Sequence, residues 1–372
     1  MIEILLIFVS FLLIVCLCFF AADIVPIFLR WFKRIHIGRY TDKNVWRDSV
    51  KKIALKTIKK MPPVPVTDRE HYTLVPKLKG EYFNFYFNTW QVAALLSAQS
   101  DDNEAIAAAY AFLDKEDWSN RCYNTGAAMF FYSLLEAGLE DDEKLQAIMA
   151  DFVAKVTAAA GDKALPYTLQ TGEHFVDTLG MVCPFLIKYH QLYGAPEMFE
   201  LAKRQFDEFY EFGIHEKTDL PVHCFNPDSG MPLGVYGWGR GCGWLALALD
   251  ECIGLLDGKD EYAAVLKERA EQLIKAVLHH QNDDGSFSAL LGVYSSRHDS
   301  SATAMIGGLL CRMGYREEAE KCLAYLMSVT RRNGEVDFAQ GDTMGIGNYS
   351  HRFDPMPAAQ GFALRLAKKL DK

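Results

Sequence analysis

The chain has 372 residues, of which half are hydrophobic and 23% are charged, and its formal net charge is −9. This composition excludes a disordered chain and provides enough apolar material for a large core. The acidic balance argues against a surface that follows the phosphates of nucleic acid, so no nucleic-acid partner is expected. Residues 1–40 carry a net charge of +2, and the rest of the chain therefore carries −11.

The first element is an apolar segment at residues 4–22 that contains no charged side chain. As a helix, these 19 residues would span about 28 Å, close to the thickness of the hydrocarbon layer of a bilayer. Only three residues precede the segment, and they include Glu3, whereas a cleaved signal peptide begins with basic residues. The sequence therefore predicts a retained single-pass anchor that contacts the lipid bilayer through residues 4–22.

The orientation of this anchor follows from its flanking charges. The four basic residues within residues 1–40 all come after the apolar run: Arg30, Lys33, Arg34 and Arg39. Because flanking Lys and Arg favour the cytoplasmic side, we expect the large domain to be cytoplasmic. The cysteines of the body lack the spacing of a small disulfide scaffold, which agrees with a reducing compartment.

After residue 40 the apolar residues recur three or four positions apart, which is the period of amphipathic helices, and alternation typical of strands is scarce. The pattern predicts a dozen helices. They are expected at residues 45–61, 90–99, 103–113, 126–137, 143–159, 177–193, 197–211, 243–256, 260–280, 302–313, 316–328 and 357–370.

The connections between these helices alternate in length. Short links, such as residues 257–259, alternate with long segments rich in Gly, Pro and aromatic residues, such as residues 213–240 and 333–356. This alternation is typical of an α/α toroid, in which the long loops gather on one rim and carry the function. No fixed repeat consensus of an open solenoid is present. We therefore expect residues 41–372 to form one closed, all-α barrel behind an anchor and basic juxtamembrane segment at residues 1–40.

Asp177 is the first candidate for chemistry, because it opens an otherwise apolar helix after His174 and Phe175. One interpretation is an N-cap, a position that Asp favours. The other is a carboxyl group at the edge of an apolar cavity, where desolvation would raise its pKa and make it a usable acid and base. The pattern alone leaves both open.

Residues 237–244 read Gly-Trp-Gly-Arg-Gly-Cys-Gly-Trp and form a poor start for a helix. They would make a good ligand surface, because Gly permits close approach, Trp can stack on sugar rings and Arg240 can pair with a carboxylate. The alternative is a tightly packed loop in which Arg240 is structural. Upstream, His223 precedes a turn-rich segment at residues 226–230 that would bring it to the same rim, although a single histidine is more often structural.

Several other classes of site are not supported by the sequence. The chain contains no Gly-x-Ser-x-Gly elbow, no phosphate-binding loop and no cluster of metal ligands, so no metal and no cofactor is expected. Ordinary glycoside hydrolysis uses two carboxyl groups that flank the scissile bond. Asp177 could be one of them, but no loop offers an obvious second.

Taken together, the motifs of the body resemble those of the unsaturated rhamnogalacturonyl hydrolases, glycoside hydrolase family 105, and their relatives, the unsaturated glucuronyl hydrolases of family 88. The resemblance runs in order through roughly residues 88–370. Its elements are HFVDTLGMVCPF (174–185), LPVH (220–223), WGRGCGW (238–244), DGSF (284–287), SSATAM (300–305) and AAQGFAL (358–364).

This resemblance implies an (α/α)6 barrel that removes a 4,5-unsaturated uronic acid from the non-reducing end of oligosaccharides left by polysaccharide lyases. The reaction is hydration of the C4=C5 double bond, for which one carboxyl group suffices. By position, Asp177 matches the family's catalytic aspartate. The residues implied as substrate contacts are His223, Trp238, Arg240, Trp244, Met181 and Trp90, with Arg240 expected on the uronate carboxylate.

The sequence departs from the family at two positions. Asn124 stands where the family has a second catalytic aspartate that holds sugar hydroxyls, and Cys242 replaces an Asn that is frequent within the Trp-Arg motif. These departures leave open a catalytically weak or silent carbohydrate-binding protein. A third alternative is an ordinary glycosidase that acts on saturated substrates.

Overall fold

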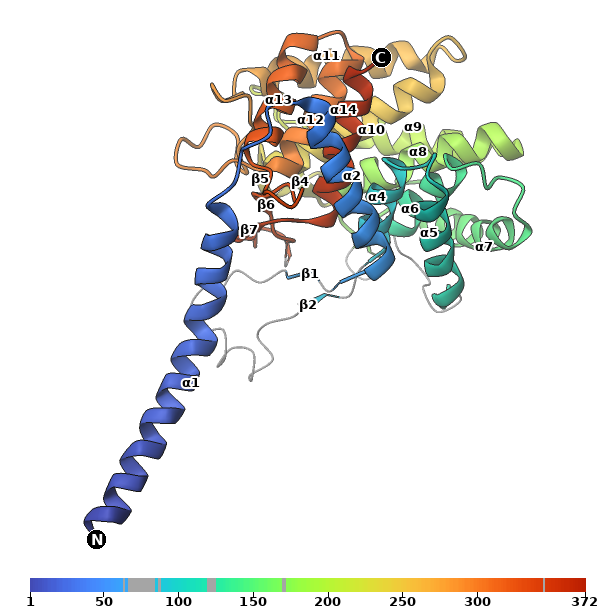
Figure 1. Ribbon diagram of the computed structural model, residues 1–372. Coiled ribbons are helices and arrows are strands. Elements are labelled where there is room, and N and C mark those ends of the chain that lie inside the picture. Colours follow the sequence, from blue (N-terminus) through green and yellow to red (C-terminus); the bar gives the residue numbers. More distant parts are fainter. Residues whose placement is uncertain (63, 66–83, 86–87, 119–124, 169–171, 344) are drawn as a thin grey trace.

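Helices make up most of this computed structural model, which describes residues 1–62, 64–65, 84–85, 88–118, 125–168, 172–343 and 345–372 (Figure 1). Within these residues, six helices form an inner ring: each packs on the next, and the last packs on the first. The ring confirms the predicted α/α barrel. Its members are α4 (Thr89–Ser97), α6 (Thr125–Leu135), α8 (Val176–Tyr193), α10 (Gly239–Leu256), α12 (Ser300–Arg312) and α14 (Pro357–Leu370).

Outer helices alternate with the inner ones along the chain and cover the ring. They are α2 (Lys43–Lys60), α5 (Asn103–Lys115), α7 (Glu143–Ala160), α9 (Pro196–Phe212), α11 (Tyr262–Leu278) and α13 (Arg316–Ser328). Each buries one stripe, as in α2, where Trp46, Val50, Ala54 and Ile58 recur every four residues. The inner helices are apolar on nearly every face because they are enclosed on all sides. The predicted helix bounds therefore agree with the structure to within a few residues, with one exception.

The exception is the glycine-rich start of α10. The sequence predicted a non-helical segment before residue 243, but the helix begins at Gly239. A side chain at Gly239 would overlap the Ser288 carbonyl oxygen, and a Cβ at Gly243 would lie 2.7 Å from the Met305 side chain. These glycines therefore permit close packing between neighbouring elements, and the lower helical propensity of Gly is overridden by that packing.

Short strands lie in the long connections on the rim where the inner helices begin. In the described chain, β3 (His174–Phe175), β4 (Val222–Phe225) and β5 (Pro232–Tyr236) form an antiparallel sheet in that order. Two antiparallel pairs complete the set, β1 (Val64–Pro65) with β2 (Asn84–Phe85) and β6 (Ala339–Gln340) with β7 (Phe353–Asp354). Strands of two to five residues are too short to produce a readable alternation, which is why the sequence did not reveal them.

The first helix, α1 (Ile2–Arg34), extends away from the barrel and ends beside β7 (Figure 1). Most of its large apolar side chains are exposed. By length and composition it could cross a bilayer, and among the described residues it is the one helix that could. A signal sequence near the N-terminus would have the same properties, so the structure supports a candidate membrane segment here and leaves its orientation as an expectation.

Candidate active site

A cavity of about 590 Å³ opens on the rim where the inner helices begin. The first turns of four inner helices supply its floor, and the strands and long loops supply its wall. The lining residues are Asn88, Thr89 and Trp90 at α4, Gly126 of α6, Asp177 and Met181 of α8, Arg240 and Trp244 of α10, Phe175 and His223 of β3 and β4, and Tyr167, Thr168, Glu173, Asp342, Thr343, Gly345 and Ile346 of the loops.

Asp177 lies in the first turn of α8 with its carboxyl group directed into this cavity. It does not cap the helix, since the N-cap residue is Phe175 and no side chain bonds to the free amides there. The side chain is buried, and its Oδ2 atom has no hydrogen-bond partner among the described residues. Of the two interpretations left open by the sequence, the geometry fits the carboxyl group at the edge of a cavity.

Burial has a large effect on the acidity of this carboxyl group. Desolvation raises the pKa of Asp177 from 3.8 to about 7, the Arg240 guanidinium opposes the rise, and the Asp342 carboxylate adds to it. A carboxyl group with this pKa is present in both protonation states near neutral pH. It can therefore give up a proton and later take one back, which is the requirement for a general acid and base.

His223 approaches Asp177 from β4, with 3.8 Å between its Nε2 atom and the Asp177 Oδ2 atom. Burial and the nearby Arg240 lower the pKa of His223 to about 4, so the ring is neutral at pH 7. The Tyr349 hydroxyl accepts a bond from the Val235 amide and lies 3.0 Å from His223 Nδ1. If that hydroxyl donates to Nδ1, the proton of the neutral ring is on Nε2, which faces Asp177.

Arg240 is buried in the wall of the cavity and is fixed by two main-chain carbonyls. Its two terminal nitrogens donate to Gln340 O at 2.5 Å and to Gly341 O at 2.8 Å. These bonds use two of the five N–H groups of the guanidinium, and the Asp342 carboxylate lies 4.0 Å away. A planar cation held in this way is suited to recognise a carboxylate with little loss of side-chain entropy.

Asp342 is the main site residue that the sequence reading missed. It lies in the long segment between α13 and α14, and burial raises its pKa against the opposing effect of Arg240. The expectation that no loop offers a second carboxyl group is therefore wrong. The only available signal was its position in a predicted long loop of the functional rim, and nothing in the local pattern distinguished it from other loop aspartates.

Six of the residues expected at the site line one cavity: Asp177, His223, Arg240, Trp244, Met181 and Trp90. The rings of Trp90 and Trp244 meet edge to face with their centroids 5.8 Å apart. They form an apolar surface next to the polar groups, an arrangement suited to a sugar ring.

Two other residues lie elsewhere. Trp238 does not line the cavity: it is buried behind His223, and its indole donates to the Gln340 side chain at 2.9 Å. We correct its expected role from substrate contact to support of the site. Cys242 is buried in the core and is also absent from the lining, so the departure at this position does not reach the cavity wall.

Asn124 and a possible metal site are the remaining features that the sequence raised. Asn124 lies outside the described residues, so its expected place in the cavity stays a prediction. In the part of the chain that the structure describes, no group of three or more His, Cys, Asp or Glu side chains could hold a metal ion.

Comparison with known proteins identifies the family to which the chain is similar. The sequence profile of Glycosyl Hydrolase Family 88 matches residues 103–352. The unsaturated rhamnogalacturonyl hydrolase YesR of Bacillus subtilis is 24% identical over 238 residues, which cover 61% of this chain and 69% of that protein.

Solved structures agree on the fold. A possible member of the GH105 family from Salmonella enterica serovar Paratyphi A superposes with a TM-score of 0.71 at 18% identity, over 89% of this chain and 94% of that one. The unsaturated glucuronyl hydrolase of Bacillus sp. GL1 gives a TM-score of 0.66 at 18% identity, over 89% and 97%. With a family profile that covers most of the barrel and a fold that matches throughout, the chain belongs to Glycosyl Hydrolase Family 88 and is a glycoside hydrolase.

Proposed function

We propose that this chain removes a 4,5-unsaturated uronic acid from the non-reducing end of lyase-generated oligosaccharides by hydrating the C4=C5 double bond. The observation that carries the proposal is the buried Asp177 carboxyl group, which has a pKa of about 7 and one oxygen without a hydrogen-bond partner among the described residues. It lies in one cavity with a fixed arginine and two tryptophans. The names of the family relatives, which are unsaturated rhamnogalacturonyl and glucuronyl hydrolases, support this substrate class.

In the proposed reaction, the protonated Asp177 carboxyl group transfers its proton to C4 of the double bond. Positive charge develops at C5, and a water molecule attacks there while the Asp177 carboxylate takes a proton from it. The product is a hemiketal at C5, which opens and releases the rest of the saccharide. The carboxyl group ends the cycle protonated, so one residue serves both half-reactions and its pKa near 7 suits both.

The uronate carboxylate needs a cationic partner in a molecule whose body carries a charge of −11. Arg240 is the proposed partner, because it lines the cavity and has N–H groups that are not used by Gln340 O and Gly341 O. The N-termini of α4, α6, α8 and α10 also meet at this cavity, and their dipoles favour a negative ligand. The proposed sugar-stacking surface is formed by Trp90 and Trp244, with Met181 beside them.

The test is turnover by the full chain of a panel of unsaturated disaccharides, followed by loss of the ultraviolet absorbance of the conjugated enol ether. We expect Asp177→Asn to lose activity by a factor of about 100 or more, since it removes the general acid and base. The matched control is Asp228→Asn, the same change at an exposed carboxylate that pairs with Lys163 outside the cavity. Unchanged turnover in Asp177→Asn would refute the proposal.

A second candidate function is favoured by Asp342, which gives the cavity the pair of carboxyl groups that an ordinary glycosidase needs. Matched saturated disaccharides in the same panel separate the two functions, because hydration needs the double bond and displacement at the anomeric carbon does not. Tight sugar binding without turnover of either set would instead indicate the silent carbohydrate-binding protein.

We further propose that α1 is retained as a bilayer anchor through residues 4–22, with the barrel in the cytoplasm. The basic residues that follow the apolar run support this orientation. Protease added to intact spheroplasts should leave the barrel uncut, whereas the same protease added after lysis should cut it. Digestion of the barrel in intact spheroplasts would place it on the outer side.

A further inference from the structure

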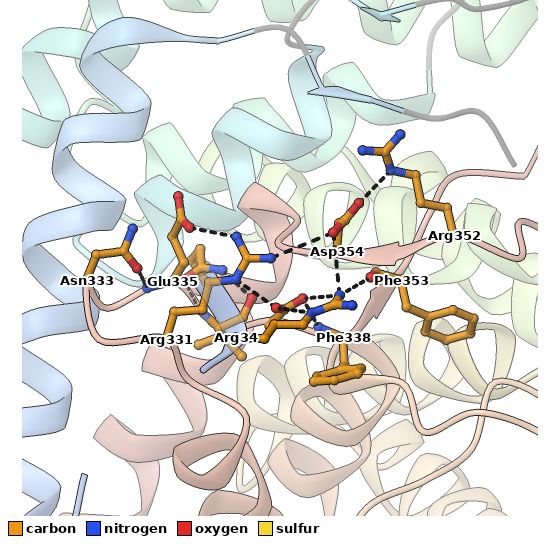
Figure 2. Close-up of polar contacts among 11 residues, drawn as sticks. Arg34, Arg331, Asn333, Glu335, Phe338, Arg352, Phe353 and Asp354 are labelled. Carbon is orange, nitrogen blue, oxygen red and sulfur yellow. Dashed lines mark hydrogen bonds and ion pairs between the residues drawn. The ribbon is translucent and has the colours of Figure 1, made fainter. Parts of the chain in front are cut away.

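The C-terminal end of α1 is held on the barrel by a cluster of charged side chains around Asp337, which we call the Asp337 cluster. Figure 2 labels its members Arg34, Arg331, Arg352 and Asp354. The Asp337 side chain is fully buried. It accepts a forked pair of bonds from Arg34, at 2.8 and 3.0 Å, and a bond from Arg331 at 2.7 Å. The remaining members are Asp354, which lies 3.7 Å from Arg331, and Arg352, which donates to Asp354 at 2.7 Å.

Arg34 is the only contribution of α1 to this cluster among the described contacts, and it reaches β7 and the two residues that precede β6. Besides its fork on Asp337, it donates to the Phe353 carbonyl at 2.5 Å and lies 3.5 Å from Asp354. Its guanidinium also lies 4.5 Å from the centre of the Phe338 ring. The last residue of the candidate membrane helix is thus part of the packing of a barrel segment about 300 residues further along the chain.

That barrel segment also builds the active site. Asp337 Oδ1 accepts the Phe338 amide at 2.7 Å, and Phe338 has a positive φ of 60°, a strained conformation for a side chain of this size. Two residues later, Gln340 and Gly341 present the carbonyls that fix Arg240. The Gly341 amide in turn donates to the Arg352 carbonyl at 2.8 Å, and Asp342 follows in the cavity wall.

The electrostatics make Arg34 necessary to this arrangement. A buried carboxylate is stable only with its charge partners in place, and loss of one partner favours conformations in which the carboxylate regains water. Phe338 and β6 follow Asp337 directly in the chain, so a shift of Asp337 towards water would carry them along. Such a shift would displace the two carbonyls that hold the guanidinium of Arg240.

We propose that Arg34 is a positioning residue for the active site, so that the end of the membrane helix is a working part of the catalytic domain and not only a tether. The consequence is that a chain cut between Arg34 and the barrel would keep its core helices but hold Arg240 and Asp342 loosely. The inference concerns how the site is supported, and the first test below does not depend on the proposed reaction.

The first test is amide hydrogen exchange of the full chain in detergent micelles, read by mass spectrometry on peptides that cover residues 338–343. We expect Arg34→Met to speed exchange in this segment by about tenfold or more, because its closed state is destabilised. The matched control, Lys33→Met, removes an exposed charge from the neighbouring residue and should leave exchange unchanged. Peptides from β4 and β5 on the same rim serve as the internal reference.

Arg34→Lys keeps the charge but cannot form the forked pair of bonds to Asp337, so an intermediate rate of exchange is expected. If Arg34→Met fails to fold, this variant tests the role of Arg34 in its place. Exchange in residues 338–343 that is the same in wild type, Arg34→Met and Arg34→Lys would overturn the proposal. In turnover assays, both Arg34 variants should raise KM for the anionic substrate with little change in kcat. A fall in kcat at unchanged KM would also contradict it. If the wild type has no turnover, the reaction is refuted and the exchange result still decides the role of Arg34.

Discussion

At the scale of single residues, burial favours the uncharged forms of both Asp177 and His223, although one is an acid and the other a base. It raises the pKa of Asp177 to about 7 and lowers that of His223 to about 4. The His223 ring is therefore neutral when the Asp177 carboxyl group, 3.8 Å away, is protonated, and the two do not form an ion pair. This state suits a carboxyl group that must deliver a proton to carbon, because a nearby imidazolium would lower its pKa.

The neighbouring carboxylate provides a direct test of this acidity. Asp342 raises the pKa of Asp177, so Asp342→Asn should lower it. The general acid must be protonated in the free enzyme, and kcat/KM should therefore fall above the pKa of Asp177. The alkaline limb of the pH profile is expected near pH 7 in the wild type and at lower pH in Asp342→Asn. Asp228→Asn is the control, and a limb that moves upward or stays in place would contradict the assignment.

The sequence was sufficient to identify most of this site. Asp177, His223 and Arg240 could be found because each stands in a recognisable motif of the family. Asp342 could not, since its function depends on where a loop of the last long connection folds, and no local pattern encodes that position. Trp238 belongs to the same motif as Arg240, yet it points away from the cavity, because successive residues at a helix start face different directions.

At the scale of elements, α10 combines two functions in a single helix. Its first two turns carry Arg240 and Trp244 in the cavity, and its second half buries two acids, Asp250 and Glu251. The acids pair with cations of α12 and α14: Arg312 bonds to Asp250, Lys369 lies 2.5 Å from Asp250, and Arg365 bonds to Glu251. Burial alone would raise the pKa of Glu251, but Arg365 and Lys369 lower it to about 2, so the acid is ionised.

Removing one member of this charged cluster should strongly lower the free energy of unfolding. Arg365→Met leaves Glu251 ionised and buried with fewer partners, and we expect it to lower the free energy of unfolding by about 3 to 5 kcal/mol. The matched control is Lys368→Met, because Lys368 is exposed and lies 3.5 Å from Asp101. Its effect should stay within about 0.5 kcal/mol. Thermal unfolding of both variants measures the difference, and equal stability of the two would contradict a structural role for the buried pair.

The helices themselves were predictable because the outer helices have one-sided apolar stripes and the inner helices are rich in apolar residues at helical spacing. The helical start of α10 could not be predicted from the sequence, because glycine has a low helix propensity. Propensity also takes no account of tertiary neighbours such as Ser288, which leaves no room for a side chain at Gly239. The short strands were also missed. Their pairing is fixed by tertiary contacts among long loops and not by their own residues.

At the scale of the whole molecule, the two ends of the barrel differ in charge and in function. The cavity is at the N-terminal ends of the inner helices, and cations such as Arg312 and Lys369 lie at the C-terminal ends. The candidate membrane helix α1 leaves from the side of the barrel that carries β7 (Figure 1). If α1 is inserted, the mouth of the barrel is held near the membrane surface, and oligosaccharides must reach it there.

The central claim is that the chain hydrates a double bond and does not displace a group at the anomeric carbon. Proton magnetic resonance of a single reaction tests it most directly, with an unsaturated disaccharide and its saturated counterpart mixed with the full chain. We predict that the vinyl H4 signal of the unsaturated substrate disappears at the same rate as the second sugar is released, while the saturated disaccharide stays intact. Cleavage of the saturated disaccharide, or release of a monosaccharide that still carries the vinyl proton, would contradict the account.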